Sequence, residues 1–234
     1  MRFRDLARAA AGALLDLVYP PRCAACGEPA PGGPFCGVCA GAVDPVPPGC
    51  ARCGQPGPDA LCGACHASPP AFDAVRAGGL LGGPLAEAIH ALKYRNRPAL
   101  ARPLGGWLAA RVPVGAGAVV VSVPLARGRR VERGYDHAAL LADHLARASG
   151  ARVRRLRAAL RRVRETPPQV GRTREERARN VAGAFEASGA ALEGQDVVLV
   201  DDVVTTGATA DAAAAALRRA GARSIVVVAL ARAE

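Results

Sequence analysis

Beyond about residue 71, apolar residues fall into short runs and helically spaced sets that alternate along the chain. The run AVVVSVP, residues 118–124, is β-branched and too short for a helix, and Leu140, Leu141 and Leu145 follow it at helical spacing. QDVVLV and RSIVVVALA repeat the strand pattern on either side of a long Ala-rich helix. Two helices, residues 85–94 and about 100–111, are expected before the first clear strand. This alternation predicts an α/β fold with a parallel sheet covered on both faces.

The N-terminal stretch MRFRDLARAAAGALLDLVYP has basic residues before a short apolar segment, as a signal peptide has. Asp5 and Asp16 interrupt that segment, so the spacing favours a short amphipathic helix over a signal. No run of about 18 uncharged apolar residues occurs, so no membrane span is expected. We therefore expect a cytoplasmic protein.

Charge and cysteine divide the chain at about residue 70. The formal net charge is +11, yet residues 1–70 carry five Arg against four Asp and one Glu and are neutral. All eight Cys lie between Cys23 and Cys65. We expect an N-terminal helix with a cysteine module at residues 1–70, and the α/β domain at residues 71–234.

The cysteines form four C-x2-C pairs, and two such pairs complete a tetrahedral zinc site. Equivalent pairs recur 26 or 27 residues apart, which indicates a duplicated zinc ribbon. An interleaved pairing of the four motifs stays possible, since nine, ten and eight residues separate successive pairs. The simplest scheme gives two structural Zn²⁺ sites: Cys23, Cys26, Cys36 and Cys39 on one ion, and Cys50, Cys53, Cys62 and Cys65 on the other.

Four disulfides in a secreted domain are the competing explanation for this spacing, and the Cys-free remainder of the chain argues against them. His66 directly follows Cys65 and could act as a fifth donor, although a surface histidine fits better because every Cys is already assigned. The segments between the cysteine pairs are rich in Gly and Pro, as in PGGP and QPGPD, and leave little apolar core. Metal binding should therefore supply most of the folding free energy of this module.

The segment VVLVDDVVTTGAT, residues 197–209, places two carboxylates at the end of a strand and a glycine-containing loop before a helix. Ligands of parallel sheets bind beyond the carboxyl ends of the strands. A loop of this kind presents backbone N–H groups and the positive helix end to a phosphate. Asp201 and Asp202 could then accept hydrogen bonds from sugar hydroxyls. The alternative is an ordinary turn in which an Asp caps the helix.

The same segment resembles the phosphoribosyl-pyrophosphate (PRPP) motif of type I phosphoribosyltransferases. Three further segments, HALKYRNRP (90–98), VPLARGRRVERGYDHAALLA (123–142) and RETPPQVGRTREERARNVAGAF (164–185), together with the Cys-rich N-terminus, resemble the competence protein F (ComF) family. The resemblance covers essentially the whole chain. One departure is YDH at residues 135–137, where an aromatic residue followed by Asn-Gln is expected.

By this resemblance, Asp201 and Asp202 are the catalytic acidic pair that holds the ribose hydroxyls, and the turn at residues 124–127 is the pyrophosphate loop. Residues 164–180 would close over bound PRPP, with Arg172 and Asn180 among the contacts, and Lys93 with Tyr94 matches a family landmark. The resemblance implies the following PRPP-binding residues: Thr205, Thr206, Gly207, Ala208, Thr209, Pro124, Leu125, Arg127, Arg133, Lys93, Gln169 and Arg177.

The reaction implied is loss of pyrophosphate from C1 of PRPP and its replacement by an unidentified acceptor. Mg²⁺ is the expected cofactor because hard cations favour the oxygens of pyrophosphate and ribose. The protein would position the reactants and neutralise charge.

The alternative function is a non-catalytic accessory of natural transformation that binds single-stranded DNA and DNA-uptake proteins. From Arg152 to Arg179 there are eleven Arg against three Glu, a density of charge that attracts polyanions. Aromatic residues make up only 3% of the chain, which leaves few platforms for stacking bases.

Overall fold

The computed structural model describes residues 20–165 and 180–233 and contains a five-stranded sheet in the order β1-β7-β6-β2-β3. Every neighbouring pair in this sheet is parallel, which confirms the predicted α/β class. The five strands are β1 (Ala74–Leu80), β2 (Val119–Ser122), β3 (Arg154–Arg155), β6 (Asp196–Val204) and β7 (Ser224–Arg232).

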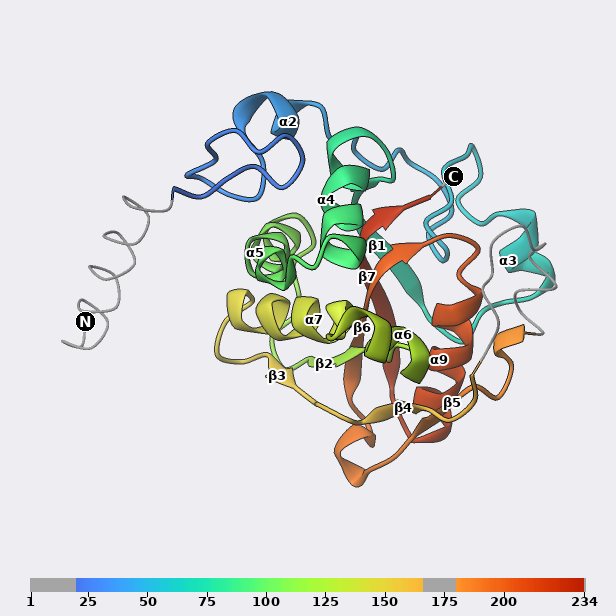
Figure 1. The fold of residues 1–234 in the computed structure, drawn as a ribbon. Helices are drawn as coiled ribbons and strands as arrows, with labels where there is room; N and C mark the ends of the chain where they lie inside the picture. The colour runs from blue at the N-terminus through green and yellow to red at the C-terminus, as the bar shows by residue number, and fades with distance from the viewer. Residues whose placement is uncertain (1–19, 166–179, 234) are drawn as a thin grey trace.

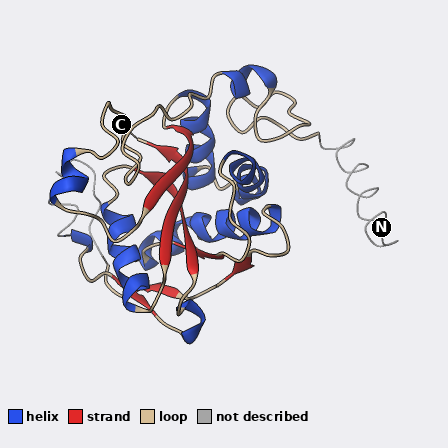
Figure 2. Cartoon of the chain, turned by 180° about the vertical axis from the view of Figure 1, so that it is seen from behind, coloured by secondary structure: helices blue, strands red, loops and turns tan. Residues whose placement is uncertain are grey.

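Helices cover both faces of the sheet (Figures 1 and 2). One face carries α4 (Gly83–Tyr94), α5 (Ala101–Arg111) and α7 (His137–Ala148), with the 3-10 turn η1 (Pro98–Leu100) before α5. The other face carries α9 (Ala208–Arg219) and an antiparallel pair of β4 (Leu160–Arg162) and β5 (Phe185–Ala187). The short α6 (Arg127–Arg133) and η2 (Ala190–Leu192) lie in connections. Within the described residues, no helix is both long and apolar enough to cross a membrane.

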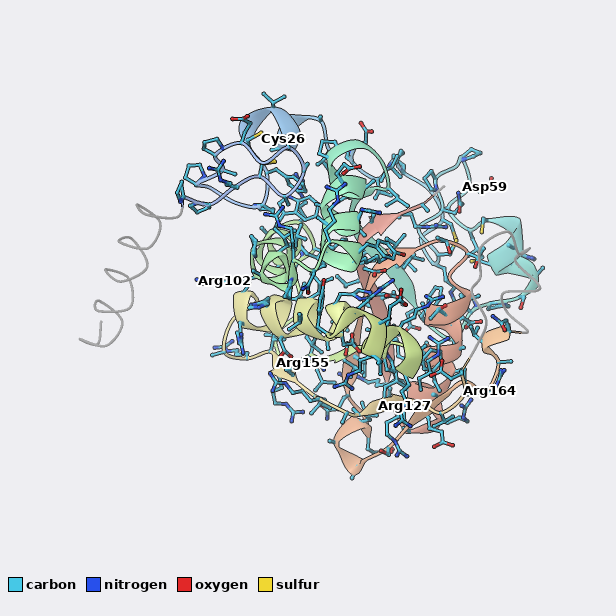
Figure 3. The ribbon with its side chains drawn as sticks, in the orientation of Figure 1. Cys26, Asp59, Arg102, Arg127, Arg155 and Arg164 are labelled. Atoms are coloured by element: carbon cyan, nitrogen blue, oxygen red, sulfur yellow. The ribbon has the colours of Figure 1, made fainter. Side chains whose placement is uncertain are left out.

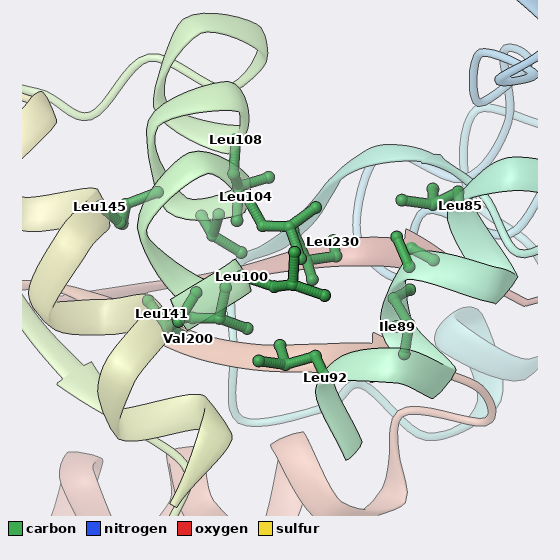
Figure 4. Close-up of a cluster of buried hydrophobic side chains, with 14 of the residues drawn as sticks. Leu85, Ile89, Leu92, Leu100, Leu104, Leu108, Leu141, Leu145, Val200 and Leu230 are labelled. Carbon is green, nitrogen blue, oxygen red and sulfur yellow. The ribbon is translucent and has the colours of Figure 1, made fainter. Parts of the chain in front are cut away.

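The core on the α4, α5 and α7 face is built from leucines that recur every three or four residues (Figure 4). Leu141 and Leu145 of α7, for example, are fully buried, as predicted from their helical spacing. They meet strand residues such as Val200 and Leu230, whose strands are apolar on both faces. The helix begins after Asp136, whose Oδ1 accepts a hydrogen bond from the N–H of Ala139 at 3.0 Å.

Both expected helices precede β2, the first clear strand, as predicted, but a further strand, β1, comes before them and was not predicted. Its sequence, AVRAGGL, carries two glycines and does not read as a strand. Both glycines allow close approach of other elements. A Cβ on Gly78 would lie 2.4 Å from the Trp107 ring, and a Cβ on Gly79 would lie 2.8 Å from the Asp44 carbonyl oxygen.

Each half of the cysteine module packs on its own part of the α/β domain. The first ribbon, residues 20–44, includes α2 (Gly37–Gly41) and contributes Cys23, Phe35 and Val43 to the core beneath α4 and α5. The second ribbon, residues 49–67, includes α3 (Gly63–Ala67) and contributes Cys50, Cys53 and Cys65 to the core on the α9 side. The boundary at residue 70 stays a prediction.

Candidate functional site

The acidic pair lies near the carboxyl end of β6, in the middle of the sheet. Asp201 is partly exposed, whereas Asp202 is buried, with 5% of its surface accessible. The Oδ2 atom of Asp202 lies 2.9 Å from the Lys93 Nζ at the end of α4, and it also contacts Nε2 of His137, the first residue of α7. Three elements that are distant in sequence therefore meet at one carboxylate.

His137 is in turn held by Arg133, whose Nη1 lies 3.2 Å from His137 Nδ1. A guanidinium can only donate, so Nδ1 accepts and the Nε2 side of the ring faces the Asp202 carboxylate. The Arg133 guanidinium also lies 4.7 Å from the centre of the Tyr94 ring. Arg133 thus links the exposed Tyr94 ring to His137, which contacts Asp202.

The two carboxylates differ in how readily they ionise. Burial opposes ionisation of Asp202, yet Lys93 and His137 outweigh it and hold the pKa of Asp202 below its usual range. Burial and the negative charge of Asp202 together raise the pKa of Asp201 to about 7. Asp202 is therefore a neutralised internal anion, and Asp201 is the carboxylate left to engage a ligand.

The loop after β6 forms a small hollow at the start of α9. Gly207 adopts a left-handed conformation, with φ of 81°, and α9 begins at the next residue, so the N–H groups of its first turn face the loop. The hollow has a volume of about 40 Å³ and is lined by Asp201 and residues 203–210, among them the predicted Thr205, Thr206, Ala208 and Thr209. Its size and donors suit a phosphate group.

The predicted pyrophosphate loop follows β2, as expected. Pro124 and Leu125 lie in an extended turn, and the Leu125 N–H donates to Asp136 Oδ2 at 3.2 Å. Arg127 begins α6 and is exposed, whereas Arg133 at the end of α6 is joined to the acidic pair through His137.

The predicted closing loop falls largely outside the described residues, and with it Gln169, Arg172 and Arg177. Its described ends are close together, since Arg164 Nη2 donates to the carbonyl oxygens of Asn180 at 3.0 Å and Ala182 at 2.6 Å.

The eight cysteines gather into two clusters with the sequential pairing, within each of which all sulfur atoms lie within 4.8 Å of one another. None of them forms a disulfide. The distances Cys26 Sγ to Cys36 Sγ and Cys53 Sγ to Cys62 Sγ are both 3.7 Å. Four thiolates at about 2.3 Å from a tetrahedral Zn²⁺ would be separated by about 3.8 Å, so both clusters fit zinc. His66 is exposed and belongs to neither cluster.

Many described arginines of the 152–179 run have partners within the chain. Arg155 and Arg157 both pair with Asp143, beside a hollow of about 580 Å³ between α7 and β3. Arg154 donates to Gln195, and Arg161 lies 3.6 Å from Glu186. Figure 3 places Arg155 and Arg164 at separate points of the molecule. These arginines therefore make local contacts at several separate places on the molecule.

Sequence reasoning missed His137 as a site residue. Its signal was the YDH departure, because the residue that replaces the expected amide is the one that contacts Asp202. It also missed Arg232, which is buried at the end of β7 and donates to the Thr205 carbonyl oxygen at 2.5 Å.

Two family models match the chain: a double zinc ribbon domain over residues 14–70, and a phosphoribosyl transferase domain over residues 134–234. The second covers β6, α9 and β7, which carry the acidic pair and the loop. Fold and models together define the class, which is a phosphoribosyltransferase-type α/β domain preceded by a double zinc ribbon.

Similar proteins narrow this class. Competence protein F of Haemophilus influenzae is 32% identical over 181 residues, which cover 74% of this chain and 78% of that protein. The DNA utilization protein YhgH of Escherichia coli K12 is 33% identical over 73% of this chain and 77% of that protein. Competence protein ComFC of Bacillus subtilis is 34% identical over 44% of this chain and 39% of that protein. The chain belongs to the competence protein F (ComF) family.

Among solved structures, the chain is similar to the glutamine PRPP amidotransferase of B. subtilis complexed with ADP and GMP. The two are 26% identical, with a TM-score of 0.38, over 61% of this chain and 27% of that chain. The chain thus spans about a quarter of that structure, and the assignment of family does not depend on this likeness.

Proposed function

We propose that this protein binds PRPP at the loop after β6 and transfers its phosphoribosyl group to an acceptor with loss of pyrophosphate. The observation that carries the proposal is the asymmetric acidic pair beside the phosphate-sized hollow. Asp202 is paired with the Lys93 ammonium and contacts His137, whereas Asp201 lines the hollow with the hydroxyl-bearing loop. A sugar phosphate would bind with its phosphate at the loop and its hydroxyls at the Asp201 carboxylate.

In this proposal the 5′-phosphate accepts hydrogen bonds from the first-turn N–H groups of α9, and Asp201 accepts one from a ribose hydroxyl. The Asp201 Oδ1 atom already accepts the N–H of Asp202 at 2.8 Å, which fixes its orientation. The C1–oxygen bond to pyrophosphate breaks and a bond from C1 to the acceptor forms, while the acceptor gives up its proton. The proposal assigns Arg133, which is joined to Asp202 through His137, as the cation that offsets the charge of the leaving pyrophosphate.

The donor set also fits Mg²⁺. This ion keeps several waters and binds through one or two carboxylates and the phosphates of a substrate. Asp201 provides one such carboxylate, and Asp202 is occupied by Lys93 and His137. When bound, Mg²⁺ would neutralise the pyrophosphate as it leaves.

Calorimetric titration of PRPP with Mg²⁺ tests the proposal. We expect wild-type protein to bind and Asp201→Asn to bind at least tenfold more weakly, because the variant loses the charge that faces the ligand. Glu193→Gln, which changes an exposed carboxylate outside the site, is the matched control and should bind as wild type does. Absence of wild-type binding would refute the proposal.

A second candidate function is binding of single-stranded DNA, which would link the chain to relatives named for DNA utilization and competence. It is favoured by α6, on which Arg127, Arg129 and Arg130 are all exposed (Figure 3 marks Arg127). Binding of an oligonucleotide should then weaken steeply with salt, and replacing the three arginines by Ala should flatten that slope. An unchanged slope would remove α6 from consideration.

A further inference from the structure

Arg232 is a buried cation that the proposed reaction leaves unused. The described part of the chain buries three ionisable side chains besides cysteines, namely His137, Asp202 and Arg232. The first two contact each other in the site. Arg232, with 2% of its surface accessible, lies at the end of β7. A buried guanidinium is costly unless its N–H groups are satisfied, so its partners indicate what it is there to hold.

One side of the Arg232 guanidinium holds the start of the phosphate loop. Its Nη1 donates to the carbonyl oxygen of Val204 at 3.0 Å and to that of Thr205 at 2.5 Å. Val204 is the last residue of β6, and Thr205 is the first of the loop that lines the hollow. Arg232 therefore fixes the point at which the loop leaves the sheet.

The other side of the same guanidinium holds the second zinc ribbon. Its Nε donates to the carbonyl oxygen of Cys53 at 3.2 Å, and its Nη2 donates to Oε1 of Gln55. Cys53 is a ligand residue of the second cluster. A single rigid group thus joins the metal-binding turn to the loop, and the planar fork of Arg suits this bridging role.

A second connection reaches the loop from the segment that leaves the second ribbon. Phe72 is buried, and a Cβ on Gly207 would lie 3.6 Å from its ring. The N–H of Ala71 donates to Oδ1 of Asp211, in the first turn of α9, at 2.7 Å. The second ribbon and its connection therefore contact both the start and the end of the loop.

The first ribbon has no such connection. Among residues described, no hydrogen bond joins residues 20–44 to residues 201–211. Its contacts go instead to β1 and α5, through the Leu80 N–H to the Asp44 carbonyl oxygen at 2.8 Å and through the Phe35 and Trp107 rings.

We infer that the second zinc ribbon, but not the first, is part of the phosphate-binding machinery, with Arg232 as the positioning residue that connects the two. Metal at the second cluster keeps the Cys53 turn folded, the turn holds Arg232, and Arg232 holds the loop. Loss of that metal should loosen the loop and weaken sugar-phosphate binding. The statement about binding rests on the proposed function, whereas the statement about the loop does not.

The test compares matched variants of the full chain, Cys53→Ser/Cys62→Ser and Cys26→Ser/Cys36→Ser, which remove equivalent ligand pairs from the two clusters. Zinc content should fall by about one equivalent in each. Amide hydrogen exchange of residues 203–210 should accelerate at least tenfold in the second-ribbon variant and change less than twofold in the first-ribbon variant. Affinity for PRPP with Mg²⁺ should follow the same order. Equal exchange in the two variants would overturn the inference.

The exchange measurement needs no ligand, so it decides the inference even if wild-type protein fails to bind PRPP, an outcome that would refute the proposed function alone. If the second-ribbon variant does not fold, Gln55→Ala replaces it, because it removes one ribbon contact of Arg232 and leaves the cysteines intact. Arg232→Lys should keep only part of the protection of residues 203–210 from exchange, since one ammonium group cannot span both sides. Exchange at the wild-type rate in Arg232→Lys or in Gln55→Ala would show that the bridge to the ribbon is dispensable.

Discussion

The two zinc ribbons are copies of one sequence pattern that dock on the α/β domain by partly different contacts. Each buries apolar side chains and makes one backbone hydrogen bond to β1, from the Leu80 N–H to the Asp44 carbonyl oxygen and from the Val75 N–H to the Arg52 carbonyl oxygen, both at 2.8 Å. The first adds the Phe35 ring, packed edge-on against Trp107 at 5.7 Å between centroids, whereas the second adds side-chain hydrogen bonds from the buried Arg232. Figure 3 shows how far apart they sit, with Cys26 in one and Asp59 in the other.

The difference teaches that duplicating a module does not duplicate its role. Apolar contacts are tolerant of small shifts, so the first ribbon can cover α5 without controlling what lies beyond it. Hydrogen bonds from a buried guanidinium are directional, so the second ribbon transmits its position to the groups that it contacts. The second ribbon is therefore where a change in the cysteine module should reach the site.

The largest effect should come from removing one metal ligand in each ribbon. Losing a structural zinc forfeits about 10 kcal/mol of apparent binding free energy, enough to unfold the ribbon that it holds. Trp107 is the only tryptophan, and its ring contacts Phe35 of the first ribbon. Cys39→Ser should therefore shift its fluorescence emission to the red, while Cys65→Ser leaves it unchanged. Identical emission shifts in both variants would contradict the separate docking described above.

The apolar docking of the first ribbon can be weakened without touching its metal. Phe35→Ala removes a buried ring and should destabilise the docked ribbon by about 3 kcal/mol. Urea titration followed by Trp107 fluorescence measures the change. Val38→Ala, at a side chain that is 84% exposed in the same ribbon, serves as the control and should shift stability by less than about 0.5 kcal/mol.

The affinity of the site for PRPP should depend on pH, because Asp201 titrates. Its pKa is raised to about 7, so the carboxylate becomes ionised as the pH rises through that value. Affinity for PRPP with Mg²⁺ should increase about tenfold, or about 1.4 kcal/mol, from pH 6 to pH 8. Calorimetry of Asp201→Asn isolates this effect from titration of the ligand itself. Phe35→Ala should keep the wild-type pH profile, and a changed profile would mean that the first ribbon also reaches the site.

The smallest expected effect concerns the segment that follows the second ribbon. Asp73 accepts two hydrogen bonds from Arg218 Nη2, at 2.7 and 2.6 Å, and one from the Ile225 N–H. Because the pair is partly exposed, Asp73→Asn should cost only about 1 kcal/mol of unfolding free energy. Glu87→Gln, which breaks the exposed pair with Arg95, should cost less still. Urea denaturation measures both changes, and a larger loss of unfolding free energy for Glu87→Gln than for Asp73→Asn would contradict the prediction.

The parts of the molecule that sequence predicts well are those with local signals. Cysteine spacing predicted both clusters, and apolar runs predicted β2, β6 and β7, because each pattern is complete within a few residues. β1 was missed because its glycines make room for Trp107 and the first ribbon, which is a tertiary requirement. Arg232 gave no signal, since Cys53 and Gln55 lie far away in sequence and the chain is rich in arginine.

The order of strands in the sheet also has a consequence for how the chain folds. β1, the first strand made, pairs only with β7, the last, whereas β6 with its acidic pair lies between β7 and β2. Such pairings close long loops and are slow to form. During synthesis the cysteine ribbons and β1 are therefore made first, and the edge of β1 that pairs with β7 stays unpaired until β7 is made. In the interval before β7 is made, this unpaired edge is a site at which the nascent chain is prone to aggregate.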